Sequence, residues 1–141
     1  MLIIPRSILN KMIDHVKAHY PREVCGVMIG YSEGTKIFVR AAIPLSNLSL
    51  SQNRFWFDER EWMKIIIEFS KKGLDYIGIY HSHPDSSPLP SMNDLERMLE
   101  CPGEIWVIVS YSPPNKIDIK AWTIPSYYSG VSSVPLLISS D

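Results

Sequence analysis

The chain has 141 residues, of which 45% are hydrophobic and 21% charged, values typical of one ordinary globular domain. Its 15 acidic and 14 basic side chains give a formal net charge of −1 at pH 7, which argues against non-specific binding of nucleic acid. The two cysteines, Cys25 and Cys101, can close at most one disulfide, so a disulfide scaffold is excluded.

The sequence contains no recognisable signal peptide or membrane span. Four apolar residues near the N-terminus end at Pro5, and no later apolar run approaches the ~18 residues that a span needs. We therefore expect a soluble, cytoplasmic protein that does not bind membranes and whose thiols stay reduced.

Hydrophobic spacing and turn residues predict a mixed α and β domain, in which helices flank a sheet without regular β-α-β alternation. The expected helices lie at 6–19, from the cap at 58–61 to the stop at Gly73, and at 91–100; the expected strands lie at 24–31, 36–43, 54–57, 74–80, 105–111 and 117–124. Residues 1–125 are predicted to form the domain. Residues 126–141, rich in Ser, Tyr and Pro, are predicted to form an irregular C-terminal tail.

Two histidines follow directly on the strand predicted at 74–80. His81 and His83 point to the same side of an extended chain, because side chains alternate along a strand. Asp94 lies eleven residues beyond His83, across a loop stiffened by three prolines. Two imidazoles and one carboxylate leave a fourth position open, which is typical of catalytic rather than structural zinc. The sequence therefore predicts one Zn²⁺ per chain at His81, His83 and Asp94.

Hydrolysis at such a site also needs a base that takes a proton from water and passes it on. The local sequence leaves four carboxylates open as this base, namely Glu23, at the start of the strand predicted at 24–31, Glu61, Asp85 and Glu96.

The motif formed by these residues resembles the signature of the JAMM, or MPN-plus, metalloprotease family. Glu23 is followed by His81-Ser82-His83, seven residues, Ser91, two residues and Asp94, and the resemblance covers roughly residues 1–124. It implies the cytidine-deaminase-like MPN fold, an α/β (α+β) architecture with a central, mostly antiparallel β-sheet flanked by helices. It also implies that Glu23 is the general acid/base and that Ser91 donates a hydrogen bond to the oxyanion.

The family resemblance also indicates an activity. JAMM enzymes hydrolyse amide and isopeptide bonds, often at the C-terminal tail of ubiquitin or a ubiquitin-like protein, and some bacterial members act on sulfur-carrier proteins. A chain of 141 residues leaves little room for ubiquitin-gripping insertions, so it is more similar to the short prokaryotic members. We therefore expect a zinc-dependent metallopeptidase or isopeptidase whose partner is a ubiquitin-like or sulfur-carrier protein with a Gly-rich tail. The oligomeric state stays open, a homodimer included.

The same residues also allow other functions and purely structural roles, which we consider in turn. A non-catalytic MPN scaffold would need none of the motif residues, and a zinc deaminase would need a Cys-x-x-Cys that is absent from the chain. Ser91 and Asp94 have the spacing of a helix cap, which is compatible with catalysis. Cys25 could in principle be a nucleophile, but a buried, inert thiol is expected because its neighbours carry no charge. His15 and His19 are assigned to the surface.

Overall fold

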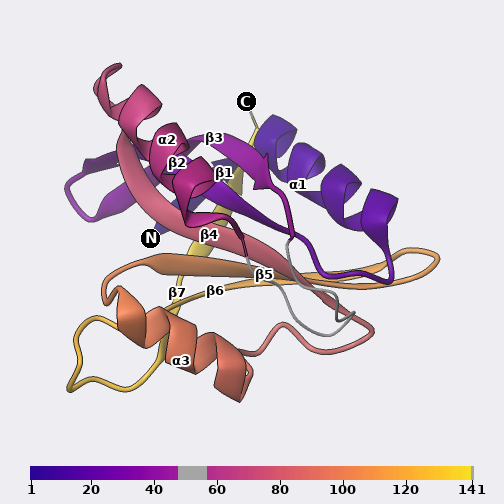
Figure 1. The fold of residues 1–141 in the computed structure, drawn as a ribbon. Helices are drawn as coiled ribbons and strands as arrows, with labels where there is room; N and C mark the ends of the chain where they lie inside the picture. Colours follow the sequence, from indigo (N-terminus) through magenta and orange to yellow (C-terminus); the bar gives the residue numbers. More distant parts are fainter. Residues whose placement is uncertain (48–56, 141) are drawn as a thin grey trace.

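The computed structural model describes residues 1–47 and 57–140 (Figure 1), which form three helices and eight strands. In chain order these are β1 (Leu2–Pro5), α1 (Arg6–His19), β2 (Cys25–Glu33), β3 (Lys36–Leu45), α2 (Glu59–Ser70), β4 (Asp75–Pro84), α3 (Met92–Glu100), β5 (Ile105–Ser112), β6 (Lys116–Thr123), β7 (Ser132–Val134) and β8 (Leu136–Ser139). None of the described helices is long and apolar enough to cross a membrane.

All the described strands belong to one sheet, in the order β7-β6-β5-β4-β2-β3-β1-β8. Four of its seven pairings are antiparallel, and the pairs β4–β5, β1–β3 and β1–β8 are parallel. The predicted fold class, a mostly antiparallel sheet flanked by helices, is therefore confirmed. The strand that carries the two histidines, β4, lies near the middle of the sheet and is paired on both sides.

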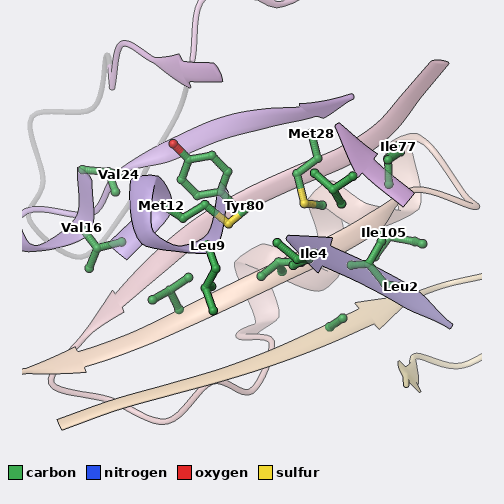
Figure 2. Packing of buried hydrophobic residues seen from close by; sticks show 14 of the residues in the cluster. Leu2, Ile4, Leu9, Met12, Val16, Val24, Met28, Ile77, Tyr80 and Ile105 are labelled. Atoms are coloured by element: carbon green, nitrogen blue, oxygen red, sulfur yellow. The ribbon is translucent and has the colours of Figure 1, made fainter. Parts of the chain in front are cut away.

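The helices cover both faces of the sheet. Because adjacent residues of a strand point to opposite faces, neighbouring side chains of β4 pack with different helices. On one face, Leu9 and Met12 of α1 pack with Tyr80 of β4, as Figure 2 shows. On the other face, Ile79 of β4 packs with side chains of α2 and α3, Met98 of α3 among them. Both histidines of the motif alternate with Tyr80 and so lie on the face covered by α2 and α3.

Most of the predicted elements are present, with three differences before residue 126. The strand predicted at 74–80 continues to Pro84, so the histidines lie within β4 and not after it. Strand β1 was not expected, because four residues between the N-terminus and Pro5 carry no clear pattern. Of the strand predicted at 54–57, residues 54–56 lie outside the described residues, and Phe57 precedes α2 without strand structure.

The prediction of an irregular tail at 126–141 was wrong for residues 132–139. Strand β7 pairs with β6 at one edge of the sheet, and β8 pairs with β1 at the other edge. Only Pro135 separates β7 from β8, and its carbonyl accepts a hydrogen bond from the backbone of Leu2 at 2.8 Å. The two edges of the sheet therefore meet at Pro135, so the sheet curls back on itself. Pairing between residues so distant in sequence leaves no local periodicity to detect.

If β8 holds the two edges together, its inward side chains should contribute to stability. Ile138 packs against the α1-side core, whereas the neighbouring Leu137 is 48% exposed. We expect Ile138→Ala to lower the free energy of unfolding by about 1–2 kcal/mol, and Leu137→Ala by less than about 0.5 kcal/mol. Urea denaturation of the two variants checks this; equal and negligible effects would mean that the C-terminal residues do not pack in solution.

Candidate active site

Strand β4 fixes the positions of both histidines through its pairing. His81 lies opposite Cys25 of β2 on one side and Ile108 of β5 on the other, and His83 lies opposite Ser110 of β5. His81 is fully buried and His83 is 7% exposed. Because the backbone on both sides is hydrogen-bonded into the sheet, the two imidazoles are held at a rigid part of the fold.

The third member of the group, Asp94, comes from the first turn of α3. Ser91 is the N-cap: its Oγ accepts a hydrogen bond from the backbone of Asp94 at 3.1 Å, and its own backbone donates to Asp94 Oδ2 at 2.9 Å. This reciprocal capping box satisfies two backbone donors at the helix start and fixes the Asp94 side chain. The capping role expected for Ser91 and Asp94 is therefore confirmed. Asp94 itself is buried, with only 3% of its surface exposed.

The three side chains converge on one point. Asp94 Oδ2 lies 3.0 Å from Nε2 of His83, and Asp94 Oδ1 lies 3.4 Å from Nε2 of His81. The possible ligand atoms of the three residues all lie within 4.8 Å of one another. This group could therefore hold a metal ion, because a single cation at its centre would be in reach of all three.

The second ring nitrogen of His83 supports the same arrangement. Nδ1 lies 2.8 Å from the carbonyl oxygen of Ser87 and so donates its proton there. With Nδ1–H donated to this carbonyl, Nε2 faces Asp94 and the shared point, where it donates to the carboxylate when protonated and offers a lone pair to a metal when neutral. A carbonyl in this role orients many metal-binding histidines and strengthens them as ligands.

The pKa shifts of the three residues also favour a cation site. Burial lowers the pKa of His81 to about 3, which keeps this imidazole neutral and able to coordinate. Burial also opposes protonation of His83, but the hydrogen bonds with Asp94 and Ser87 outweigh it and raise the pKa of that histidine. The same contact with His83, against the effect of burial, lowers the pKa of Asp94. The Asp94 carboxylate thus stays ionised despite its burial because His83 and the backbone of Ser91 stabilise its charge, and a cation at the shared point would do the same.

Glu23 lies at the edge of this group, in the segment just before β2. The backbone of Val24 donates to Ser82 Oγ at 2.9 Å and accepts from the backbone of Ser82 at 3.0 Å, which ties this segment to β4. Glu23 is 8% exposed, and its Oε2 has no hydrogen-bond partner among the described residues. Burial raises the pKa of Glu23 to about 7, with His83 opposing and Asp94 adding to the rise.

The other three carboxylates considered as the base lie elsewhere. Asp85 is exposed and accepts a hydrogen bond from the Tyr20 hydroxyl at 2.5 Å, and Glu96 is exposed on α3. Glu61 accepts from the backbone of Ser46 at 3.3 Å. Of the four, Glu23 alone is buried and interacts electrostatically with His83 and Asp94.

Two other expectations have different outcomes. Cys25 is fully buried, and burial raises the pKa of its thiol to about 12, so the expected inert cysteine is confirmed. The assignment of His15 to the surface was wrong: it is half-buried, its Nδ1 lies 2.8 Å from the Tyr80 hydroxyl, and burial lowers its pKa to about 4. His19 is exposed, as expected.

Several supporting residues were not found from the sequence. Ser82, between the histidines, anchors the segment of Glu23, and Trp106 of β5 packs edge-on against the His81 ring with centroids 5.2 Å apart. The Ser87 carbonyl carries no side-chain signal at all. The parallel pairing of β4 with β5, which places Trp106, also could not be derived from local spacing.

Comparison with known proteins gives a consistent family. The model of the prokaryotic homologues of the JAB domain matches residues 5–125. A desampylase from Haloferax volcanii is 36% identical over 118 residues, which cover 83% of this chain and 81% of the relative. A CysO-cysteine peptidase from Mycobacterium tuberculosis is 29% identical over 124 residues, covering 88% of this chain and 83% of the relative.

A solved structure has the same fold over the whole chain. The solution structure of a protein from Desulfitobacterium hafniense superimposes with a TM-score of 0.87 at 27% identity, covering 100% of this chain and 94% of that one.

If the group around Asp94 binds a metal, removing its carboxylate should abolish binding. We expect Asp94→Ala to lose the bound divalent ion, whereas Asp118→Ala, an exposed aspartate on β6, should keep it. Elemental analysis of the purified proteins gives the ratio of metal to chain. Equal metal content in the two variants would place the ion elsewhere.

Proposed function

Because the chain belongs to the family of prokaryotic homologues of the JAB domain, we propose that it is a zinc-dependent peptidase or isopeptidase. Its substrate is an amide bond at the Gly-rich C-terminal tail of a ubiquitin-like or sulfur-carrier protein. The observation that carries the proposal is the convergence of His81, His83 and Asp94 beside the buried carboxylate of Glu23. The names of the relatives support the choice of substrate, since one is a desampylase and another a CysO-cysteine peptidase.

Zinc is the metal proposed because the donor set consists of two imidazoles and one carboxylate. Three such ligands with a fourth position free are the usual arrangement of catalytic zinc. When bound, the ion supplies a Lewis acid for the scissile carbonyl and makes water acidic enough to lose a proton near neutral pH.

Glu23 moves the proton in the proposed reaction. Its carboxylate accepts a proton from the attacking water and delivers it to the nitrogen of the leaving amine. The unpartnered Oε2 is suited to this role, because a base already saturated with hydrogen bonds would have to break one first. Burial, which raises the pKa of Glu23 to about 7, lowers the cost of holding the proton between these two events.

Ser91 is proposed to donate a hydrogen bond from its hydroxyl group to the oxyanion of the tetrahedral intermediate. Its Oγ accepts the backbone hydrogen bond of Asp94, which fixes the oxygen while leaving the O–H free to point toward the substrate. Ser91 is exposed, so a substrate can reach it. Removal of one donor of this kind typically lowers the rate by about 10²- to 10³-fold.

The alternative, a non-catalytic scaffold of the same fold, is not favoured by any observation on the described residues. A scaffold has no use for a buried glutamate whose Oε2 lacks a hydrogen-bond partner among the described residues, because burying such a polar atom costs stability.

The direct test of the proposed activity is incubation with carrier-protein conjugates. We expect zinc-loaded protein to release the carrier with its C-terminal glycine intact, a chelator to abolish this release, and added zinc to restore it. Mass spectrometry of the released carrier identifies the bond that is cut. A zinc-loaded protein that releases no carrier from any conjugate would contradict the proposal.

A second expectation separates metal binding from proton transfer. Glu23→Gln should retain zinc but lower kcat by about 10²- to 10⁴-fold, because the amide cannot accept the proton. Glu96→Gln, at an exposed position of α3, is the matched control and should retain both properties. Zinc content and kcat are measured on the same preparations; full turnover by Glu23→Gln would assign the base to another group.

A further inference from the structure

The loop that follows β4, residues 85–90, turns back toward the strand at once. Ser87 lies only four residues beyond His83, yet its carbonyl oxygen is 2.8 Å from Nδ1 of that histidine. The chain reverses at Asp85, whose φ of 56° lies in the left-handed region, which aspartate adopts more readily than most non-glycine residues. The carbonyl that orients His83 therefore belongs to a loop, so its position depends on what holds that loop.

Two side chains of the sheet hold the neighbouring carbonyls of this loop. The Ser110 hydroxyl of β5 donates to the carbonyl of Ser86 at 2.5 Å. The Trp122 indole of β6 donates its Nε1–H to the carbonyl of Pro88 at 2.9 Å. Three successive carbonyls, those of residues 86–88, thus each accept a hydrogen bond from a side chain, and the middle one accepts from His83.

Both of these anchoring residues lie on the same face of the sheet as the histidines. Ser110 is the register partner of His83 in the parallel pair β4–β5. Trp122 lies opposite Trp106 in the pair β5–β6, and Trp106 packs against the ring of His81. Facing positions of adjacent strands project to the same side of a sheet, so both anchoring side chains reach the side on which His83 meets the loop.

The backbone of the loop adds to this restraint. The ring of Pro88 fixes its own φ and restricts Ser87 to extended conformations, so the peptide that carries the Ser87 carbonyl has little freedom to rotate. The start of the loop is also tied to the sheet, because the backbone of Asp85 donates to the carbonyl of Tyr111 at 2.9 Å. With the carbonyls on either side held, the Ser87 carbonyl stays directed at His83.

We propose that Ser110 and Trp122 are positioning residues that orient His83 as a metal ligand through the Ser87 carbonyl. The inference rests on the proposed function, because that function assigns the metal to His83. A ring whose Nδ1 is already held loses less rotational freedom when Nε2 coordinates a metal, and the held proton makes the ring a stronger ligand. Without the two anchoring residues the loop moves, the carbonyl leaves Nδ1, and zinc binding weakens although all three ligands remain.

Ser110→Ala tests the first anchoring residue. We expect it to raise the dissociation constant for zinc about tenfold, the lower end of the effect of losing an outer partner of a metal ligand. Ser110→Thr keeps a hydroxyl and should retain the affinity. Ser112→Ala, the same change two residues further along β5, leaves both anchoring bonds in place and should also retain it. Competition with a chromogenic zinc chelator gives the dissociation constants.

Trp122→Phe tests the second anchoring residue, because it keeps an aromatic ring but removes the Nε1–H. We expect a similar loss of about tenfold, whereas Trp62→Phe, the same change on α2, should keep the affinity. Urea denaturation of the metal-free proteins separates the alternatives, since a merely structural role would lower the free energy of unfolding and leave the zinc affinity of the folded protein unchanged. Zinc affinity that neither Ser110→Ala nor Trp122→Phe lowers would overturn the inference.

A second measurement follows His83 in the metal-free protein. The Nδ1–H proton exchanges slowly with water as long as the Ser87 carbonyl accepts it, and NMR measures this rate. We expect exchange to become about two- to tenfold faster in Ser110→Ala and Trp122→Phe, the usual effect of one hydrogen bond, and to stay unchanged in Ser112→Ala. If the unmodified protein binds no zinc, the proposed function fails and this rate still tests the positioning; a rate that neither variant raises would overturn the inference.

Discussion

The carboxylate of Asp94 links the start of α3 to the end of β4. One oxygen, Oδ2, accepts the backbone hydrogen bond of Ser91 and lies 3.0 Å from His83, while the other lies 3.4 Å from His81. Losing any of these partners leaves the buried charge less well compensated, which is destabilising, so the contacts favour a single geometry. These contacts hold the start of α3 against the end of β4. The same contacts bring together the three possible metal ligands, His81, His83 and Asp94.

The surrounding sheet makes this geometry rigid. Strand β4 is bordered by β2 and β5, Ser82 ties the segment of Glu23 to the strand, and Trp106 packs against His81. Pro135 joins the two edge strands of the same sheet, β7 and β8. Glu23, by contrast, is buried, and its Oε2 has no hydrogen-bond partner among the described residues, a cost in stability that a purely structural residue would not retain. The fold thus concentrates its buried polar groups at one end of β4.

The sequence predicted most of the secondary structure and brought His81, His83, Ser91 and Asp94 together, because the information lies in short spacings. A His-x-His in a strand and a Ser-x-x-Asp at a helix start are each set by the period of one element. What it could not predict depends on contacts between distant residues. Strands β1, β7 and β8 are short and form through long-range pairing, the Ser87 carbonyl acts through the backbone alone, and His15 is half-buried against Tyr80 of another element.

The central claim is that zinc binds between β4 and α3 and not at a cysteine. X-ray absorption at the zinc edge on the purified protein tests it most directly, because it reports the atoms in contact with the metal. We expect nitrogen and oxygen ligands at about 2.0–2.2 Å, with the signature of two imidazoles and no sulfur. A sulfur ligand at about 2.3 Å, or protein that cannot be loaded with zinc while its histidines are intact, would contradict the account.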